Sequence, residues 1–413
     1  MASSEVNSNK EISDILEVVA KVQNIKNYEI VVDSEIALGD GFLSNFYKGD
    51  VIDKDTGKSC IVAIKKAPKW EFDCAKFFAN EINFYSKVLP ALKQLQSDGT
   101  LSDPFDNTPT YFCSCSDDAN RFIALEHLRP KGYVLHDKKV YFNKSQLEFL
   151  FNLYGKLHGL SFVLQKQDIE KYNEIKADYQ DVFDMFTNTG FSYECLEKAI
   201  KKCLEILDPA SSKFKTFSKV FENVMPTIKK SLYYTGDYKC LTHGDCWSNN
   251  ILFKYSESDL EDAKLIDFQM GRESSPVHDL SYFFYSSACK DDFDALEEYL
   301  KIYYNELSRV IKTFGENPEE ILPFDKLIQE WKDNALLGVI LAFYLWEFKL
   351  LDKEKYLGLL KDVTEDKENE EKGTIVFMEL LDKVIESDIY KTRINDILNH
   401  AFEFGILTED KAA

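Results

Sequence analysis

The sequence contains no run of about 18 consecutive apolar residues, the length at which a segment becomes a candidate membrane-spanning helix. Its richest apolar stretch, residues 335–346, is shorter and is flanked by charges, so it predicts a buried core helix. The first residues, MASSEVNSNKEISD, lack the basic-then-apolar order of a signal peptide. These absences favour a cytoplasmic protein without a membrane partner.

Positive charge is also scarce, since 50 Lys and Arg residues stand against 71 Asp and Glu residues, a formal net charge of -21. Nucleic acids and anionic lipid surfaces are bound through basic patches, so this balance argues against both as main partners. The six His residues form no HxxxH or HExxH pattern, and the nine Cys residues are irregularly spaced. A zinc site is therefore disfavoured, and the cysteines are expected to be free thiols. No obligatory protein partner is evident.

The pattern along the 413 residues predicts an α+β protein with two lobes. Residues 1–27 are expected to form a polar lead-in with a short helix. Residues 28–128 show short strand patterns around one helix, in the order β-β-β-α-β-β, which predicts a small antiparallel-sheet lobe. Residues 129–413 are mainly helical in pattern. The strongest helix pattern there, residues 145–164, has Ser145 as its expected N-cap.

The most informative segment is HGDCWSNN at 243–250, followed by LIDFQ at 265–269. Asn250 follows Asp245 by five residues, and Asp267 follows 17 residues beyond the Asn. The catalytic loop of protein kinases has the same layout. Asp245 would accept or orient the proton of an acceptor hydroxyl. Asn250 and Asp267 would hold the magnesium ion that bridges the nucleotide phosphates.

The same segment also departs from protein kinases. It opens with His-Gly-Asp rather than His-Arg-Asp, Gln269 replaces the Gly of Asp-Phe-Gly, and no Ala-Pro-Glu element follows. Only 11 residues separate Asp267 from Asp279, too few for a peptide-docking activation segment. These departures favour a small-molecule kinase. His243 is expected to brace the loop by hydrogen bonds, and Asp279 either to support the loop by accepting backbone hydrogen bonds or to cap its own helix.

A lysine for the nucleotide phosphates is expected at the end of the third strand pattern, VAIK at 62–65. Glu81, on the following helix pattern, would pair with Lys65 and hold it in place. Lys66 is the alternative to Lys65. Because neighbouring side chains of a strand point to opposite faces, only one of the two lysines can face the cleft.

Two weaker signals concern the rest of the nucleotide. Gly39 and Gly41 lie in a turn between the first two strands, where the backbone would approach phosphates, although Gly-Asp-Gly is also an ordinary hairpin turn. Glu126 and Leu128 end the fifth strand, where backbone groups would bind the adenine edge or simply form a linker. A GxxxxGK[ST] sequence is absent, which excludes a Walker-type site.

With these motifs in place, the chain resembles the ecdysteroid kinase-like family, a branch of the choline/aminoglycoside kinase-like group with a protein-kinase-like fold. The resemblance covers roughly residues 28–408. It is carried by AIKKAP at 63–68, FFANEINFYSKVLPAL at 77–92, LEHLRPKGY at 125–133, LTHGDCWSNNILF at 241–253, LIDFQMGRESSPVHDLSYFF at 265–284 and YKTRINDILNHAFEFGIL at 390–407.

This resemblance implies phosphorylation of a hydroxyl on a small molecule, with ATP and magnesium as cofactors. The founding activity of the family concerns ecdysteroids, and detoxification has been proposed for other members. A lipophilic acceptor would need a mostly apolar pocket. Trp247 and Tyr282 are candidates for the wall of that pocket, and the alternative for each of them is simple packing in the core. Further candidates on the same argument are Phe283, Phe284, Phe343 and Trp346.

Two alternatives remain at this stage. One is a kinase-fold module that binds a steroid or another lipophile without catalysis. The other is a choline- or aminoglycoside-type kinase, whose cationic acceptor would suit an acidic pocket. The intact Asp245, Asn250 and Asp267 set argues against the first alternative, and the family motifs argue against the second. The preference for ATP over GTP follows from the resemblance alone.

Overall fold

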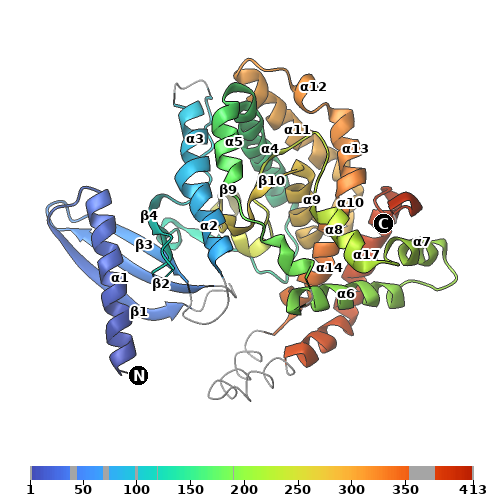
Figure 1. Ribbon diagram of the computed structural model, residues 1–413, viewed down its shortest axis with the longest axis horizontal. Coiled ribbons are helices and arrows are strands. Elements are labelled where there is room, and N and C mark those ends of the chain that lie inside the picture. Colours follow the sequence, from blue (N-terminus) through green and yellow to red (C-terminus); the bar gives the residue numbers. More distant parts are fainter. Residues whose placement is uncertain are drawn as a thin grey trace.

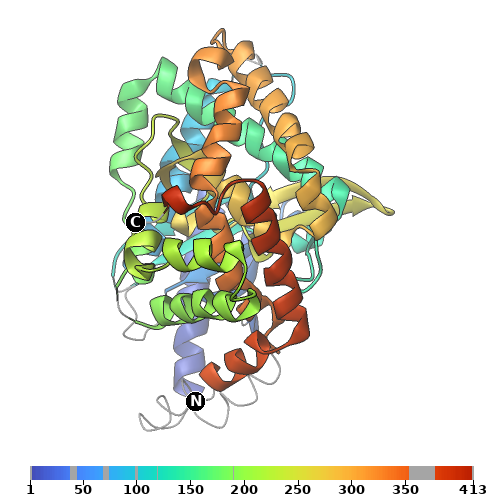
Figure 2. The same cartoon turned by 90° about the vertical axis from the view of Figure 1, so that its right-hand side faces the viewer.

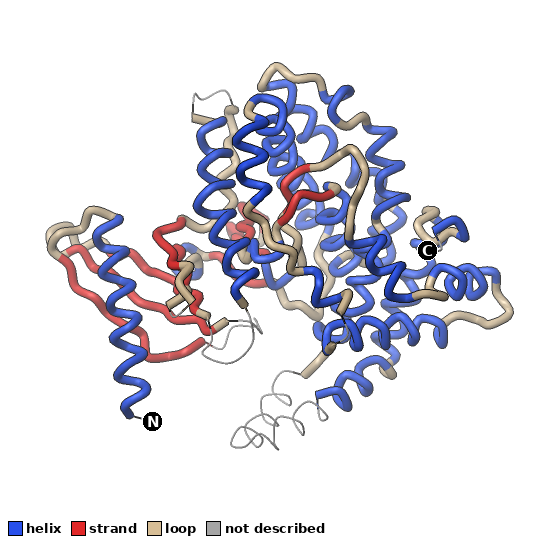
Figure 3. The backbone as a smooth tube through the Cα atoms, in the orientation of Figure 1, coloured by secondary structure: helices blue, strands red, loops and turns tan. Residues whose placement is uncertain are grey.

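The protein forms two lobes of different composition, as the computed structural model shows (Figure 1). The smaller lobe is built around a five-stranded sheet, and the larger lobe is mainly helical (Figure 3). The predicted α+β class and two-lobed arrangement are thus confirmed. The structure describes residues 2–37, 44–67, 74–97, 101–118, 120–188, 190–352 and 377–411. Within these ranges, no helix combines the length and the apolar character needed to cross a membrane.

The sheet of the smaller lobe has the strand order β1-β2-β3-β5-β4, and every neighbouring pair is antiparallel. Its strands are β1 (Tyr28–Ala37), β2 (Asn45–Asp53), β3 (Ser59–Lys66), β4 (Tyr111–Cys115) and β5 (Phe122–Glu126). The helical stretch between β3 and β4 comprises α2 (Ala75–Asn83), the π-helical turn η1 (Phe84–Val88) and α3 (Leu89–Leu95). The predicted order of three strands, a helix and two strands is confirmed.

Helix α1 (Ala2–Val22) covers one face of this sheet (Figure 1). Ile12, Leu16 and Val19 recur at helical spacing and are buried against the strands. Gly49 of β2 permits the close approach, because a Cβ at that position would lie 2.4 Å from Leu16 Cδ1. The segment predicted as a polar lead-in with a short helix therefore forms a 21-residue helix packed on the smaller lobe.

Strand β3 presents its two faces to different partners. Val62 and Ile64 are fully buried in the cluster formed with α1. Because side chains alternate along a strand, Lys66 shares the face of Ile64, whereas Lys65 points to the opposite face. Burial of the apolar pair under α1 thus decides which lysine points away from α1.

Helix α4 (Lys144–Gln167) begins with Asn143 as its N-cap, so the predicted cap at Ser145 is wrong. Asn143 Oδ1 accepts a hydrogen bond from Gln146 N at 2.9 Å, and Gln146 Oε1 accepts one from Asn143 N at 2.8 Å. This reciprocal capping box satisfies two amides that the first turn leaves without helical partners. Ser145 lies inside the first turn, and its hydroxyl donates to Asn143 Oδ1.

Two close helix pairs organise the larger lobe. Gly155 of α4 faces α11 (Leu296–Thr313), and a Cβ there would lie 2.5 Å from a backbone oxygen of that helix. Gly338 of α14 (Leu336–Leu350) faces α9 (Pro276–Ser287), where a Cβ would lie 2.4 Å from Ser281. Helix α14 contains the stretch predicted as a buried core helix, and most of its side chains are buried.

Further helices of this lobe pack around the two pairs, with α6, α8 and α17 against α14 and with α17 also against α6 (Figure 2). They are α5 (Ile169–Ala177), α6 (Phe191–Ile206), α7 (Ser212–Val220), α8 (Val224–Leu232), α10 (Lys290–Asp294), α12 (Pro318–Ile321), α13 (Phe324–Asn334) and α17 (Asp388–Glu403), with the short turns η2 (Arg129–Lys131), η3 (Phe183–Phe186) and η6 (Glu409–Lys411).

Short strands hold the segment that carries the His-Gly-Asp motif. Strand β7 (Cys240–Thr242) pairs with β10 (Arg272–Ser274), and β8 (Ile251–Ser256) lies between β6 (Tyr133–Leu135) and β9 (Asp259–Leu265). The loop between β7 and β8 ends in the turn η4 (Ser248–Asn250), and β9 leads into the turn η5 (Phe268–Met270). These two connections bring the two motif segments together at the junction of the lobes.

Candidate active site

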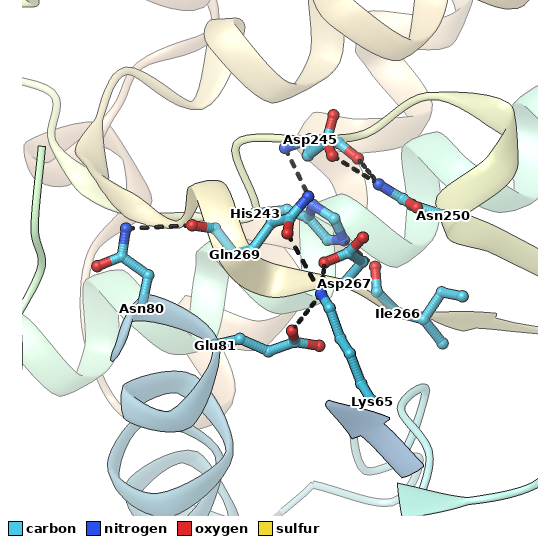
Figure 4. Close-up of polar contacts among 9 residues, drawn as sticks. All are labelled: Lys65, Asn80, Glu81, His243, Asp245, Asn250, Ile266, Asp267 and Gln269. Carbon is cyan, nitrogen blue, oxygen red and sulfur yellow. Dashed lines mark hydrogen bonds and ion pairs between the residues drawn. The ribbon is translucent and has the colours of Figure 1, made fainter. Parts of the chain in front are cut away.

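Lys65 lies at the centre of a buried polar cluster between the lobes (Figure 4). Its Nζ is 2.6 Å from Glu81 Oε2 of α2, 2.6 Å from Asp267 Oδ1 and 3.2 Å from Gln269 Oε1. Burial alone would lower the pKa of Lys65, but the carboxylates of Asp267 and Glu81 outweigh it and raise that pKa. Lys65 is therefore a fixed cation, held in place by groups from both lobes.

Lys66 has a different partner. Its ammonium group pairs with Glu11 of helix α1, on the face of the sheet that α1 covers. Of the two lysines, Lys65 contacts Asp267 and Lys66 contacts Glu11, which supports Lys65 as the lysine for the phosphates.

Asp279 of α9 holds the backbone of the loop that precedes Asp245. Its Oδ2 accepts a hydrogen bond from His243 N at 2.7 Å, and its Oδ1 accepts one from Gly244 N at 2.8 Å. His158 Nε2 lies 3.2 Å from Oδ2. Although burial raises the pKa of Asp279, the hydrogen bonds from His158 and from the Gly244 amide lower that pKa below its ordinary value. A permanent carboxylate thus anchors the loop from beneath.

His243 braces the same loop with both ring nitrogens. Asp245 N donates to His243 Nδ1 at 3.2 Å, and His243 Nε2 lies 3.0 Å from Ile266 O (Figure 4). These two contacts fit a neutral imidazole with its proton on Nε2. Burial lowers the pKa of His243, which favours the same neutral form. The loop is thereby tied to the strand end just before Asp267.

Asp245 receives hydrogen bonds on both carboxylate oxygens. Asn250 Nδ2 donates to Asp245 Oδ2 at 2.8 Å and to its backbone oxygen at 2.9 Å. The hydroxyl of Tyr282, on α9, donates to Oδ1 at 3.0 Å. Burial, with the negative charge of Asp267, raises the pKa of Asp245 to about 7. This pKa suits a group that accepts a proton near neutral pH.

Asn250 and Asp267 fit a magnesium ion in kind and number. The amide nitrogen of Asn250 is engaged with Asp245, so its Oδ1 is the atom left for a metal. Asp267, in the left-handed region with φ 65°, contacts Lys65 through Oδ1. Mg²⁺ prefers oxygen ligands and is commonly held by one or two protein groups together with substrate phosphates. The donor set of these two residues therefore matches that ion.

The region predicted to bind adenine is partly occupied by internal contacts. Glu126 N donates to Thr110 O at 2.8 Å, and the Glu126 carboxylate pairs with Lys131 and accepts from Thr110 Oγ1 at 2.9 Å. The side chain of Leu128 is buried. The Glu126 amide is therefore already engaged within the smaller lobe, and adenine binding by the remaining backbone groups stays a prediction. The two turn glycines of the sequence prediction, Gly39 and Gly41, lie outside the described residues.

The aromatic pocket candidates separate into two groups. Tyr282 reaches Asp245, and the half-buried Trp247 packs at the edge of the core beside the loop. The other candidates have no exposed surface and pack within the core, so their assignment to a pocket wall is wrong; they are Phe283, Phe284, Phe343 and Trp346. Aromatic residues at helical spacing look alike in sequence whether they face the core or a ligand.

Two polar residues at the site were not assigned a contact from sequence. Gln269 was identified only as a departure from Asp-Phe-Gly, yet its side chain accepts a hydrogen bond from Lys65. Asn80 Nδ2 donates to Gln269 O at 3.2 Å and to Gln180 O at 3.0 Å, and Asn80 Oδ1 accepts from Gln180 N at 2.7 Å (Figure 4 shows the contact with Gln269). The sequence signal for Asn80 was its position, because it is a polar residue directly before Glu81 in a helical segment that is otherwise mostly apolar.

The fold and the site together define a small-molecule phosphotransferase of protein-kinase-like architecture. A lysine-glutamate pair of the smaller lobe meets an Asp-Asn-Asp set of the larger lobe, and only a short connection joins Asp267 to α9. The chain belongs to the ecdysteroid kinase-like family, whose model matches residues 38–316. No curated protein matches the chain.

Solved structures similar to the chain include an ethanolamine kinase of Plasmodium vivax, 13% identical, with a TM-score of 0.39 over 91% of this chain and 81% of that chain. A GDP complex of aminoglycoside 2'-phosphotransferase-IIIa is 15% identical, with a TM-score of 0.39 over 91% and 98% of the two chains. A choline/ethanolamine kinase family protein from Mesorhizobium loti is 11% identical, with a TM-score of 0.37 over 94% and 99%. Similarities at this level do not bear on the acceptor.

Proposed function

We propose that the protein is an ATP- and magnesium-dependent kinase that phosphorylates a hydroxyl of a small molecule, an ecdysteroid or another lipophilic hydroxylated compound or xenobiotic. The observation that carries the proposal is the proximity of three side chains between the two lobes. Lys65 contacts Asp267, and the charge of Asp267 acts on the carboxylate of Asp245. Family membership supports the acceptor class. Choline-type and aminoglycoside-type acceptors are the alternatives to be tested beside it.

In the proposed reaction, Lys65 binds the nucleotide phosphates while Glu81 keeps its ammonium group in place. The acceptor oxygen attacks the γ-phosphorus, and the bond from that phosphorus to the β-γ bridging oxygen breaks, which releases ADP. The proton of the acceptor hydroxyl passes to the carboxylate of Asp245. Asn250 and Asp267 would hold magnesium, which neutralises charge on the phosphate oxygens when bound.

The test is magnesium-dependent ATP consumption by the purified protein against ecdysteroids, other sterols, choline, aminoglycosides and phenolic or glycosylated xenobiotics, with GTP in parallel. Asp245→Asn is expected to lower kcat on the order of 10² to 10⁴, because the positioned base is lost. Asp237→Asn makes the same chemical change at an exposed loop residue and serves as the matched control.

Full activity of Asp245→Asn would contradict the assignment of the base. ATP binding without phosphate transfer to any acceptor in the panel would contradict the kinase proposal and favour a module that binds a lipophile. Turnover confined to choline or to an aminoglycoside would overturn the proposed acceptor class while leaving the phosphotransfer chemistry in place.

A further inference from the structure

Helix α9 reaches the catalytic loop with two side chains from one face. Asp279 binds the backbone amides of His243 and Gly244, and Tyr282, three residues later, donates to the side chain of Asp245. Residues three apart on a helix are neighbours on its surface, so one rigid element contacts both the main chain and the reactive side chain of the loop. The close packing of α9 against α14 at Gly338 fixes the position of that element.

The carboxylate of Asp245 is held from two sides by different parts of the chain. Tyr282 donates to Oδ1 at 3.0 Å, and Asn250 donates to Oδ2 at 2.8 Å. The Gln269 side chain is a further hydrogen-bond partner of this carboxylate. A donor on each oxygen fixes the plane of the carboxylate, whereas loss of the Tyr282 hydroxyl would leave it freer to turn about its side-chain torsions. A carboxylate offers about four lone-pair sites, so three hydrogen bonds still leave one that is able to accept a proton from a substrate.

We infer that Tyr282 is a positioning residue for phosphoryl transfer, which holds the Asp245 carboxylate in the orientation that accepts the proton of the acceptor hydroxyl. The inference rests on the proposed function, because Asp245 is its proton acceptor. It gives Tyr282 a defined contact in place of a general role in the pocket wall. Tyr282, with 6% of its surface exposed, places its hydroxyl against Asp245 from within the core.

The direct test compares Tyr282→Phe with Tyr285→Phe. Tyr285 lies on the same helix and is fully buried, but its hydroxyl contacts His400 Nδ1 at 3.0 Å and Trp331 Nε1 at 3.3 Å. Tyr282→Phe is expected to lower kcat by roughly tenfold or more while leaving the KM for ATP within about twofold, because misorientation of a reacting group impairs the chemical step. Tyr285→Phe is expected to keep the kcat of the parent protein, whatever its Tm.

A second comparison separates positioning from a loss of structure. In the Asp245→Asn background, adding Tyr282→Phe is expected to change the residual rate by less than about twofold, because effects of groups that act as a unit are not additive. A purely structural role of Tyr282 would lower the rate by the same factor in both backgrounds, and that result would overturn the inference. Unchanged kcat in Tyr282→Phe alone would overturn it as well.

A crystal structure of Tyr282→Phe provides a readout that does not depend on activity. The Asp245 carboxylate is expected to turn away from its position or to occupy two conformers, while Tyr285→Phe leaves it unchanged. A single, unmoved Asp245 conformer in Tyr282→Phe would refute positioning even if no acceptor were turned over. Conversely, a displaced carboxylate in a protein without kinase activity would refute the proposed function and leave the contact between Tyr282 and Asp245 as a structural one.

Discussion

Gly244 explains at the scale of one residue why the motif is His-Gly-Asp. Its φ of 82° lies in the left-handed region, which residues with a side chain rarely adopt. In addition, a Cβ at this position would lie 1.9 Å from Met270 O, on the turn that follows Asp267. The glycine therefore lets the His-Gly-Asp loop and the Asp-Phe-Gln turn touch through their backbones, where an arginine would force them apart.

Gly244→Ala is expected to lower the free energy of unfolding by about 1–3 kcal/mol from backbone strain alone, and further through the clash with Met270. Gly315→Ala is the matched control, because Gly315 has a φ of 80° but a Cβ added there would meet no atom within 4 Å. Thermal or chemical denaturation of both variants, with kcat in parallel, separates the two costs. Equal destabilisation of the two variants would show that the contact with Met270 is unimportant.

At the scale of residues, the sequence predicted which residues lie close together better than it predicted which way each side chain points. The spacing of Asp245, Asn250 and Asp267 identified residues that the fold does bring together, since Asn250 contacts Asp245 and the charge of Asp267 acts on the Asp245 carboxylate. The choice between Lys65 and Lys66 depended on which face of β3 a distant helix covers, which alternation alone does not contain. Tyr282 of α9 and Asp245 of the loop after β7 meet through tertiary packing, which no local sequence pattern encodes.

At the scale of elements, helix α2 is fastened to the larger lobe along its length. Asn80 makes three hydrogen bonds to Gln180 and Gln269, Lys76 lies 2.8 Å from Asp184, and Asn83 Nδ2 donates to Ile175 O at 3.0 Å. Glu81 sits between these contacts and forms its pair with Lys65. The helix is thus held in the position from which Glu81 pairs with Lys65, the lysine proposed to bind the nucleotide phosphates.

Asn80→Ala is expected to raise the KM for ATP several-fold and to lower the free energy of unfolding by about 1–3 kcal/mol, because it leaves buried backbone groups without partners. Asn83→Ala is the control on the same helix, since Asn83 contacts Ile175 O but not the turn beside Asp267. It is expected to cost stability with little change in KM. A similar rise in KM for both variants would mean that α2 responds as a whole rather than through Gln269.

The elements themselves were largely predictable, because alternation in strands and the 3.6-residue period in helices are local properties. The π-helical turn Phe84–Val88 was not, nor was the N-cap at Asn143, which depends on a reciprocal bond with Gln146 rather than on Ser145. The tie from Asn80 to Gln180 spans 100 residues of sequence, and such a separation lies beyond any window of periodicity.

For the whole molecule, buried histidines couple stability to pH. His400 is 7% exposed, and burial, opposed by the negative charge of Asp294, lowers its pKa to about 4. Below the ordinary pKa of about 6.5, the unfolded chain binds a proton at this residue that the folded chain does not. As pH falls from about 6.5 to about 4, this histidine therefore lowers the free energy of unfolding by about 3 kcal/mol.

The measurement is chemical denaturation of the parent protein and of His400→Gln between pH 7 and pH 4. The glutamine retains a polar partner for Tyr285, whose hydroxyl lies 3.0 Å from His400 Nδ1. Asp245 and Glu81, whose pKa values burial raises to about 7, act in the opposite direction, so only the difference between the two proteins isolates His400. A difference that stays constant with pH would contradict a buried neutral His400.

The two-lobed architecture was predictable because separate motifs occurred in one consistent order along the chain. The walls of an acceptor pocket were not, because Phe283 and Trp346 carry the same pattern as a ligand-facing aromatic and yet have no exposed surface. The role of α1 was missed because its polar residues concealed a buried stripe at Ile12, Leu16 and Val19.

The buried apolar face of α1 has a practical consequence for the choice of shorter expressed fragments. The family model begins at residue 38, after α1 and β1, and ends at residue 316, before α14. A fragment with those limits would expose the apolar side chains of Val62 and Ile64 to solvent. It would also make β2 an unpaired edge strand of the sheet, and both changes promote aggregation. It would also remove the helix that packs on α9. The segment by which the family is recognised is thus shorter than the segment that must be expressed to keep the fold closed.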